Sequence, residues 1–148
     1  MKRFTFELAA LLTLRRREEE RVMMELADKN REIIGKQQEL DGVTADLKAL
    51  QASEKKRRDG NETVLELRYS VAYRYKLKAD MLALGRSIQD LLSEAETIRA
   101  RLTKATQTRK ALEMVREKKH AAWKKEASRR EQNFIDDVSQ QRYIARDR

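Results

Sequence analysis

The sequence lacks proline and cysteine altogether, and its 148 positions include only four glycines and 5% aromatic residues. Sandwich folds and α/β enzymes need turn residues about every ten positions, so this composition excludes them. Without cysteine the chain has no disulfide and no cysteine-based metal site, which is compatible with an intracellular location. What is present, at a single-domain length, is mostly Ala, Leu, Glu, Lys, Arg and Gln, a composition typical of long helices.

Long apolar runs are also missing, since none approaches the ~18 residues that a membrane-spanning helix needs. The start, MKRFTFELAALLTLRRR, slightly resembles a signal peptide. However, Glu7 interrupts its apolar run, and no small-residue cleavage site precedes Arg15. We interpret this segment as the first turns of an amphipathic helix.

Apolar residues recur at seven-residue intervals in both halves of the chain, which predicts two helices with narrow apolar seams. In the first half the seam comprises Val22, Leu26, Ile33, Leu40, Val43, Leu47 and Leu50, with Lys29 and Lys36 as polar breaks. In the second half it comprises Leu77, Met81, Leu84, Ile88, Leu91, Ala95, Ile98, Leu102, Ala105 and Leu112. Each seam is too narrow to stabilise a lone helix in water, so each needs a partner.

Residues 54–63, EKKRRDGNET, form the one credible break between the two halves. Gly60 can adopt the left-handed conformation that ends a helix, and Asn61 can cap the next one. Residues 55–58 place positive charge in the last turn of the first helix, where it suits the helix dipole. The glycines at 35, 42 and 85 lie inside the periodic runs, where each is expected to weaken or bend its helix. The cost in helix stability is roughly 1 kcal/mol per glycine relative to alanine.

These patterns predict an all-α fold, a single coiled-coil domain over residues 1–148 that forms a long antiparallel two-helix hairpin. Helix 1 is expected at about 4–58, the turn at about 59–62 and helix 2 at about 63–142. The paired residue numbers sum to 117 or to 124, and the second register is the more apolar because it faces Leu40 with Leu84. The alternative is one continuous helix that dimerises in parallel, which the charged seam positions and the turn signal disfavour.

The two predicted helices are unequal in length, so the C-terminal helix is expected to overhang. Phe4 should face a position between residues 113 and 120, which leaves about 30 residues without an intramolecular partner. The stretch REKKHAAWKKEASRREQNF, residues 116–134, lies there and holds the only tryptophan and the only histidine among seven basic residues. After Leu112 the apolar stripe changes phase and continues sparsely through Trp123, Ala127, Phe134 and Val138.

Motifs that carry catalytic chemistry are absent from the sequence. It contains no phosphate-binding loop, no dinucleotide fingerprint and no HExxH or CxxC pattern. His120 is the sole histidine and is expected to be a surface residue, and neighbouring carboxylates such as Asp136 and Asp137 point to different helix faces. A thin two-helix hairpin also has no concave pocket that could perturb a pKa. We therefore expect no enzyme activity, no catalytic residue, no cofactor and no metal site.

Two stretches, one near each end of the sequence, together carry motifs of a known protein family. The N-terminus has an aromatic-rich start, then Leu8, Leu11, Leu12 and Leu14, then Arg15 to Arg17 and an acidic block. Residues 110–143 resemble the family's most recognisable region through Ala111-Leu112-Glu113, Arg116 with Glu117, Trp123, Arg130-Glu131, Asp136-Asp137 and Arg142-Tyr143. Together the two stretches resemble the FliJ family, soluble components of the bacterial flagellar type III export apparatus. Trp123 departs from the family pattern, in which a tyrosine or another residue is common.

The resemblance implies a non-enzymatic antiparallel coiled coil similar to the central stalk of rotary ATPases. Its implied partners are the hexameric flagellar export ATPase, whose assembly and activity it promotes, the cytoplasmic domain of the membrane export gate, and export chaperones. It implies a cytoplasmic location at the flagellar base, peripheral to the inner membrane through partners only. It thus points to flagellum biogenesis, protein transport and motility.

By analogy with rotary stalks, the end that bears both termini would enter the ATPase ring. Exposed aromatic and arginine side chains are frequent interface hot spots. The residues expected to contact partners are Phe4, Leu8, Leu12, Arg116, Lys118, Lys119, Trp123, Arg130, Phe134, Arg142 and Tyr143.

Other functions stay open at the level of sequence. The formal net charge of +9 permits nucleic-acid binding, although acidic residues interleave with the basic ones and no binding module is recognised. A stalk protein of a virulence injectisome and a general coiled-coil scaffold fit the same heptads. A membrane-surface helix is disfavoured because Glu126 and Glu131 dilute the basic face.

Overall fold

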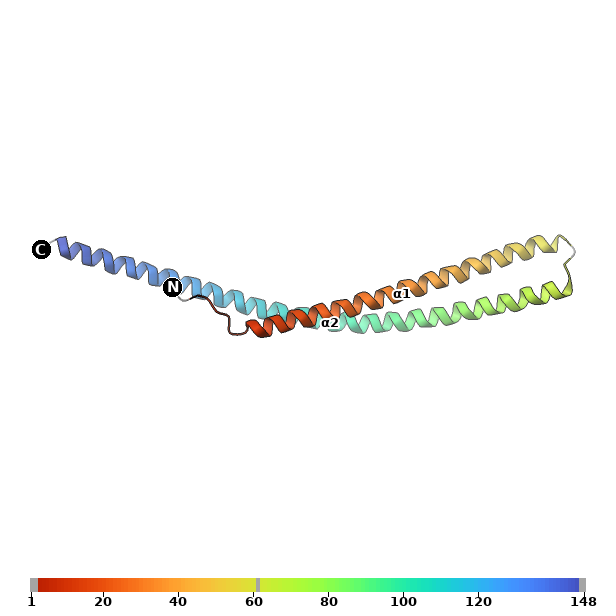
Figure 1. The fold of residues 1–148 in the computed structure, drawn as a ribbon, viewed down its shortest axis with the longest axis horizontal. Coiled ribbons are helices and arrows are strands. Elements are labelled where there is room, and N and C mark those ends of the chain that lie inside the picture. Colours follow the sequence, from red (N-terminus) through yellow and green to blue (C-terminus); the bar gives the residue numbers. More distant parts are fainter. Residues whose placement is uncertain (1–2, 61, 147–148) are drawn as a thin grey trace. The chain divides into compact units, whose positions relative to one another are not determined.

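The computed structural model of the chain describes residues 3–60 and 62–146, with side chains described up to Tyr143. Within these residues the fold contains no strand: helix α1 runs over Ala9–Arg58 and helix α2 over Val64–Arg146 (Figure 1). The two long helices pack against each other, which confirms the all-α prediction. Contacts divide the chain into a hairpin unit, Arg21–Leu102, and a terminal unit, Met1–Glu20 with Thr103–Arg148.

Helix α1 begins at Ala9 and not near residue 4, where the sequence pattern predicted its start. Residues 3–6 have no regular secondary structure, and residues 7–8 form a turn. In this turn the amide of Ala9 donates to the carbonyl of Phe6 over 3.1 Å. The non-helical backbone lets Phe4 reach side chains of α2, and that packing accounts for the later start.

The connection between the helices differs from the prediction at its central residue. Helix α1 ends at Arg58 with four basic residues in its last turn, as expected for the helix dipole. Gly60 closes a turn by donating its amide to the carbonyl of Arg57 over 3.0 Å. No described glycine has a positive φ, so the predicted left-handed Gly60 is wrong. The predicted cap, Asn61, lies outside the described residues.

The described N-cap of α2 is Thr63, and it forms a capping box with Glu66. The Glu66 carboxylate accepts a hydrogen bond from the Thr63 amide over 2.9 Å, and the Thr63 hydroxyl accepts one from the Glu66 amide over 3.3 Å. The Thr63 amide and then the Thr63 hydroxyl, which also donates to the Glu66 carboxylate over 2.9 Å, lower the pKa of Glu66. The sequence Thr63-Val-Leu-Glu66 carries the signature of this motif, although the sequence analysis did not use it.

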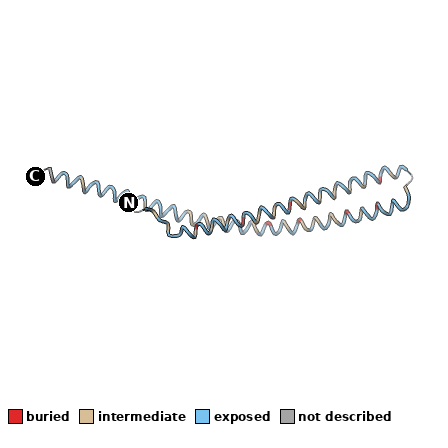
Figure 2. The backbone as a smooth tube through the Cα atoms, in the orientation of Figure 1, coloured by how far each residue is buried: buried red, intermediate tan, exposed pale blue. Residues whose placement is uncertain are grey.

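In the hairpin unit the two arms run antiparallel and face each other along the predicted heptad seam. Val22, Ile33, Leu77, Ile88 and Ala95 are buried. The other seam residues of this unit are half-buried, namely Leu26, Leu40, Val43, Leu47, Leu50, Met81, Leu84, Leu91, Ile98 and Leu102. Buried positions recur along the facing sides of the arms (Figure 2). The antiparallel pairing excludes a single continuous helix.

The lysines that interrupt the seam of α1 are paired with carboxylates. Lys29 reaches Glu94 on α2 over 2.9 Å and Glu32 on its own helix over 3.0 Å. Glu94 and then Glu32 raise the pKa of Lys29 above its usual value. Lys36 pairs with Glu39 over 3.0 Å. A charged seam position is therefore tolerated because the lysine stem stays in the seam while its ammonium reaches the edge.

Ion pairs across the hairpin unit identify the register. The residue numbers of Lys29–Glu94, Arg101–Glu25 and Arg74–Glu54 sum to 123, 126 and 128. All three values lie closer to the predicted register of 124 than to the alternative of 117.

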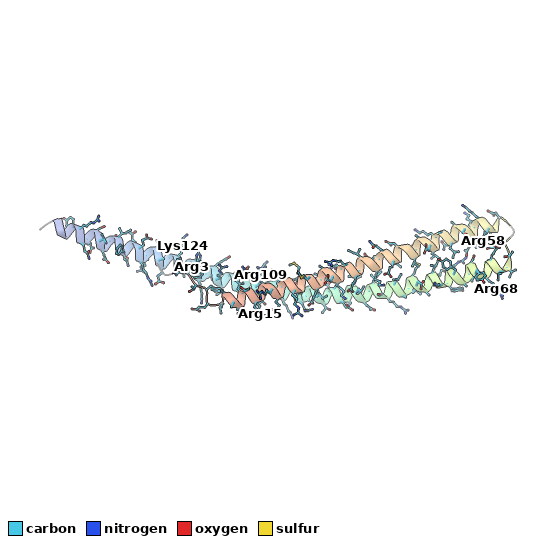
Figure 3. The ribbon with its side chains drawn as sticks, viewed as in Figure 1. Arg3, Arg15, Arg58, Arg68, Arg109 and Lys124 are labelled. Carbon is cyan, nitrogen blue, oxygen red and sulfur yellow. The ribbon has the colours of Figure 1, made fainter. Side chains whose placement is uncertain are left out.

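The seam becomes polar where the hairpin unit approaches its connection. Glu54 and Ser70 are buried there, at 6% and 5% exposed, and Glu54 forms an ion pair with Arg74. One carboxylate oxygen of Glu54 and the Nε of Arg74 are buried without a hydrogen-bond partner. Arg58 and Arg68 flank this connection on α1 and α2 (Figure 3). The last turns before the connection are thus held by a charged pair in place of apolar packing.

In the terminal unit the start of α1 packs against α2 through a short apolar seam and a charged cluster. Leu12 is 4% exposed, while Leu11, Ala105 and Leu112 are half-buried. The charged cluster comprises Arg16, Glu19, Thr106, Arg109 and Glu113. Glu19 accepts hydrogen bonds from Arg109 and from the Thr106 hydroxyl, the latter over 2.7 Å. Glu113 pairs with Arg16 over 2.8 Å and also with Arg109.

Candidate functional site

The first candidate site is built on residues 3–8, which we call the N-terminal strap, and on the facing part of α2. The Phe4 ring lies 5.0 Å from the His120 ring in an edge-on arrangement and 5.9 Å from the Trp123 ring, measured between centroids. His120 and Trp123 stack at 6.0 Å. They are three residues apart in α2, so they share one face of the helix. These three rings form an aromatic cluster.

A second contact holds the strap to α2. The ammonium of Lys119 lies 3.2 Å from the Glu7 carboxylate. Both side chains are largely exposed, and an exposed ion pair of this kind contributes at most about 1 kcal/mol. Aromatic packing of Phe4 is therefore the main contact that positions the strap.

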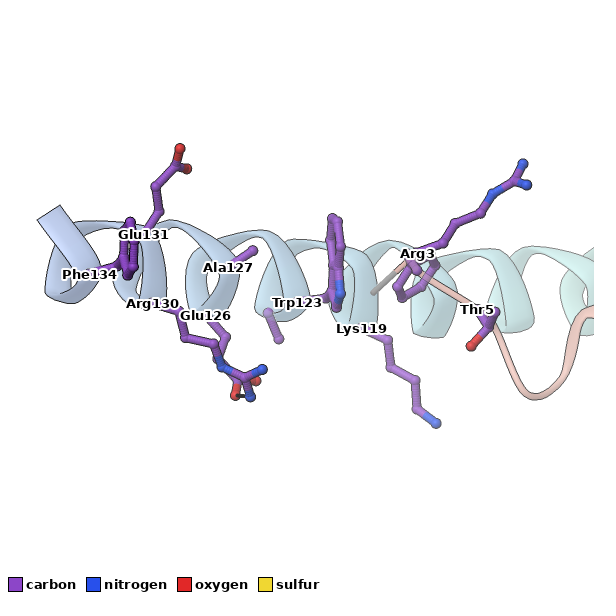
Figure 4. Close-up of a pocket in the computed structure, with 11 residues that line it drawn as sticks. Arg3, Thr5, Lys119, Trp123, Glu126, Ala127, Arg130, Glu131 and Phe134 are labelled. Carbon is purple, nitrogen blue, oxygen red and sulfur yellow. Dashed lines mark hydrogen bonds and ion pairs between the residues drawn. The ribbon is translucent and has the colours of Figure 1, made fainter. Parts of the chain in front are cut away.

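Beside the cluster lies a groove of about 740 Å³, which we call the aromatic groove. Its lining residues are Arg3, Phe4, Thr5, Lys119, Ala122, Trp123, Glu126, Ala127, Arg130, Glu131 and Phe134 (Figure 4). Trp123, Ala127 and Phe134 follow helical spacing along one face of α2, as the predicted C-terminal stripe requires. Trp123 and Ala127 are half-buried, whereas Phe134 is 68% exposed.

The structure gathers part of the predicted contact set in this groove. Phe4, Lys119, Trp123, Arg130 and Phe134 line it together. The prediction that residues beyond about 116 have no intramolecular partner is wrong for Lys119, which pairs with Glu7, and for Trp123, which packs on Phe4. The strap is not helical, and it reaches further along α2 than the helix assumed from the sequence.

Leucines of the predicted set occupy different environments. Leu8 is partly exposed at the start of α1. Leu12 is buried in the seam, so a partner reaches its side chain only if α1 and α2 separate. Arg142 and Tyr143 are exposed in the last turns of α2 and do not line the groove.

Several cations lie on this part of α2 without a partner. Arg116 and Lys118 are exposed and form no hydrogen bond or ion pair with any described residue. Lys124, Lys125 and Arg129 are likewise unpaired and line a shallower depression of about 690 Å³ with Ala121, Ser128, Gln132 and Asn133. Lys118, Lys125 and Arg129 follow helical spacing on the side of α2 opposite Trp123. This stretch thus presents an aromatic face and a basic face.

A second exposed surface, which the heptad pattern did not indicate, lies near the start of α2 in the hairpin unit. Val64, Leu67, Val71, Tyr75 and Leu82 share one helix face, and we call them the tip stripe. Val64 and Tyr75 are 75% and 72% exposed, and the other three are exposed as well. Polar Ser70 and Arg74 occupy the seam of the same turns. The helical spacing of the stripe is visible in the sequence, but the heptad search followed only the seam.

The described residues offer no constellation for metal binding. They contain no group of three or more His, Cys, Asp or Glu side chains that could hold a metal ion. Among them, no helix combines the length and the apolar character that a bilayer crossing requires.

A scan against protein-family models matches residues 4–148 to the family described as flagellar FliJ protein. The match covers residues 4–8 of the N-terminal strap and the C-terminal part of α2. Searches of curated proteins and of solved structures found no significant match to the chain.

Proposed function

Because the chain belongs to the FliJ family of flagellar export apparatus components, we propose that it is a stalk-like coiled coil that binds the hexameric export ATPase and promotes its activity. In this proposal the protein is not itself an enzyme. The aromatic groove is the observation that supports it most directly, since it gathers Phe4, Trp123, Phe134 and three cations on an open surface. Aromatic side chains and arginine are the residue types that most often dominate protein interfaces.

The C-terminal part of α2 is the segment proposed to enter the ATPase ring. From Lys124 to Tyr143 every side-chain hydrogen bond of the described residues stays within α2, as in Gln132–Asp136 and Ser139 with the Ile135 carbonyl. This supports an overhanging helix whose side chains remain available to a ring that surrounds it. Leu8, Arg116, Lys118, Arg142 and Tyr143 are proposed to add contacts around the groove.

The tip stripe is proposed as a contact for a second partner, either the cytoplasmic domain of the export gate or an export chaperone. Its five apolar side chains are exposed, and such a stripe marks protein-interaction surfaces more often than a free helix face. Two separate surfaces allow one chain to link the ATPase to the gate. In this role the protein acts in the cytoplasm at the flagellar base and reaches the membrane only through its partners.

A paired set of variants tests the assignment of the groove. Trp123→Ala with Phe134→Ala should lower both the capture of the export ATPase in a pulldown and the stimulation of its activity, by about tenfold or more in affinity, because two aromatic anchors are lost. The matched control is Tyr75→Ala with Leu82→Ala, which removes two exposed side chains from the tip stripe. Unchanged binding and stimulation by the groove variant would contradict the proposal.

A further inference from the structure

The aromatic groove extends beyond the part that the N-terminal strap occupies. Trp123 and Phe134 are separated by roughly 16 Å along the helix axis. Phe4 packs on Trp123 at one end, while Phe134 remains 68% exposed at the other. The small side chain of Ala127 lies between them on the same face. The section over Ala127 is therefore an open space with an aromatic ring at each end (Figure 4).

The strap shows which chemistry this face of α2 accepts. Its backbone is not helical at residues 3–6, and it presents an aromatic ring, Phe4, beside a cation, Arg3. Phe4 is half-buried there, so a single phenylalanine on an extended segment already finds a partner surface on α2. A second ring entering over Ala127 would meet Trp123 on one side and Phe134 on the other. Aromatic rings in such edge-on or offset contacts are stabilised by more free energy than their buried area alone provides.

Two charged groups that line the groove form no ion pair with a described residue, Arg3 of the strap and Glu131 of α2, and Glu131 is the one that can pair with a basic neighbour of that ring. Arg130 pairs with Glu126, and Lys119 pairs with Glu7. Glu131 lines the groove and forms no hydrogen bond or ion pair with a described residue. It is the lining carboxylate that remains available to a cation of the occupant.

We propose that the aromatic groove binds an extended segment of a partner protein, whose aromatic side chain inserts over Ala127 and whose neighbouring basic residue pairs with Glu131. Phe4 of the strap forms one wall of this site, so the strap completes the binding surface. The inference rests on the proposed role of the groove in partner binding and adds the chemistry of the segment that it takes.

A second copy of this chain is a poorer occupant than a partner. The segment of the chain that has this chemistry is the strap, and each strap already packs on its own Trp123. An intramolecular segment on a short tether competes at an effective concentration in the millimolar range, far above ordinary protein concentrations. The strap of a second copy would have to leave that contact before it could enter another groove.

The inference is tested by titrating the full-length protein with the blocked peptide KRFTFEL, which has the sequence of residues 2–8. Trp123 is the only tryptophan and lies at the groove, so its fluorescence reports binding directly. We expect a saturable change for the natural protein. Replacing the first phenylalanine of the peptide with alanine should weaken binding by about tenfold, as expected when an aromatic ring loses its buried area.

Ala127→Leu is the decisive variant, because leucine maintains the helix but fills the space over residue 127. It should weaken peptide binding by about tenfold or more, whereas Ala111→Leu, at an exposed position of α2 outside the groove, should leave binding unchanged. Helix content measured by circular dichroism confirms that both variants fold. Glu131→Gln should weaken binding by a smaller factor that vanishes at high salt.

Three results would overturn the inference. The first is no saturable binding by the natural protein, and the second is equal binding by Ala127→Leu. The third is a dimer in solution that Ala127→Leu dissociates, because the groove would then belong to a second copy. None of these measurements involves the ATPase, so the inference and the proposed function can fail separately. Normal ATPase stimulation by the variant that lacks Trp123 and Phe134 would contradict the proposed function but not the inference.

Discussion

At the scale of single residues, the charged cluster of the terminal unit ties the start of α1 to α2. Arg109 and then Thr106 lower the pKa of Glu19, and Arg16 lowers the pKa of Glu113, because each donates a hydrogen bond to the charged carboxylate. Glu19 and then Glu113 raise the pKa of Arg109 in turn. Arg109 bridges both carboxylates, so these side chains act as one unit and not as separate surface pairs.

This cluster should make stability depend on pH in the acid range. Both carboxylates have a folded pKa below the unfolded value near 4.5, so the unfolded chain binds protons first as the pH falls. The stability that they contribute is present above that pH and is lost as the pH drops through their folded pKa values. We expect the urea midpoint to fall between pH 7 and pH 3, and Glu19→Gln to reduce that fall.

Glu39→Gln provides the matched control, because Glu39 is exposed and, among the described residues, pairs only with Lys36 on its own helix. It should show nearly the same fall in midpoint as the natural protein. An equal fall for Glu19→Gln would mean that the cluster contributes nothing to acid sensitivity.

At the scale of elements, sequence periodicity predicted the features of each helix that depend on the spacing of neighbouring residues. The seams of both helices, the end of α1 at Arg58 and the register near 124 follow from side chains that recur on one helix face. The start of α1 could not be predicted in this way. It depends on Phe4 packing with Trp123, a contact between residues at opposite ends of the sequence, which no window of neighbouring residues contains.

The connection shows a different kind of miss. Glycine suggested the helix end, because Gly60 is the residue best able to take a left-handed conformation. The helix does end before Gly60, but without a positive φ at that residue. The start of α2 is capped by hydrogen bonds of Thr63 and Glu66, a pattern that can be recognised from the two residue types and their spacing. The tip stripe was missed because the heptad pattern was followed only along the seam between the two helices. A second apolar face on one helix has no role in such a seam.

The capping box yields a prediction for the start of α2. Thr63→Ala should destabilise the protein by about 1 kcal/mol, because the orphan amides of the first turn lose their side-chain partner. Amide hydrogen exchange of residues 64–67 should accelerate, while exchange in the middle of α2 stays slow. Thr108→Ala is the control, since the Thr108 hydroxyl only donates to the Lys104 carbonyl within the helix. Equal stability of both variants would argue against the cap.

At the scale of the whole molecule, the two ends of the sequence are needed to make one site. The N-terminal strap supplies Arg3, Phe4 and Thr5, and α2 supplies Trp123 and Phe134. The sequence indicated Phe4, Trp123 and Phe134 as contact candidates, because aromatic residues stand out in a chain with so few rings, but it did not indicate Arg3 or Thr5. It could not indicate that Phe4 and Trp123 meet, nor that a groove lies between the strap and α2.

The central claim is that the C-terminal part of α2, with its aromatic groove, binds the export ATPase. Hydrogen exchange of the full-length protein, alone and in complex with the ATPase, tests it most directly. The account predicts slower exchange over residues 117–143 in the complex and unchanged exchange over residues 64–82, where the tip stripe lies. Protection at residues 64–82 with none at residues 117–143 would contradict it.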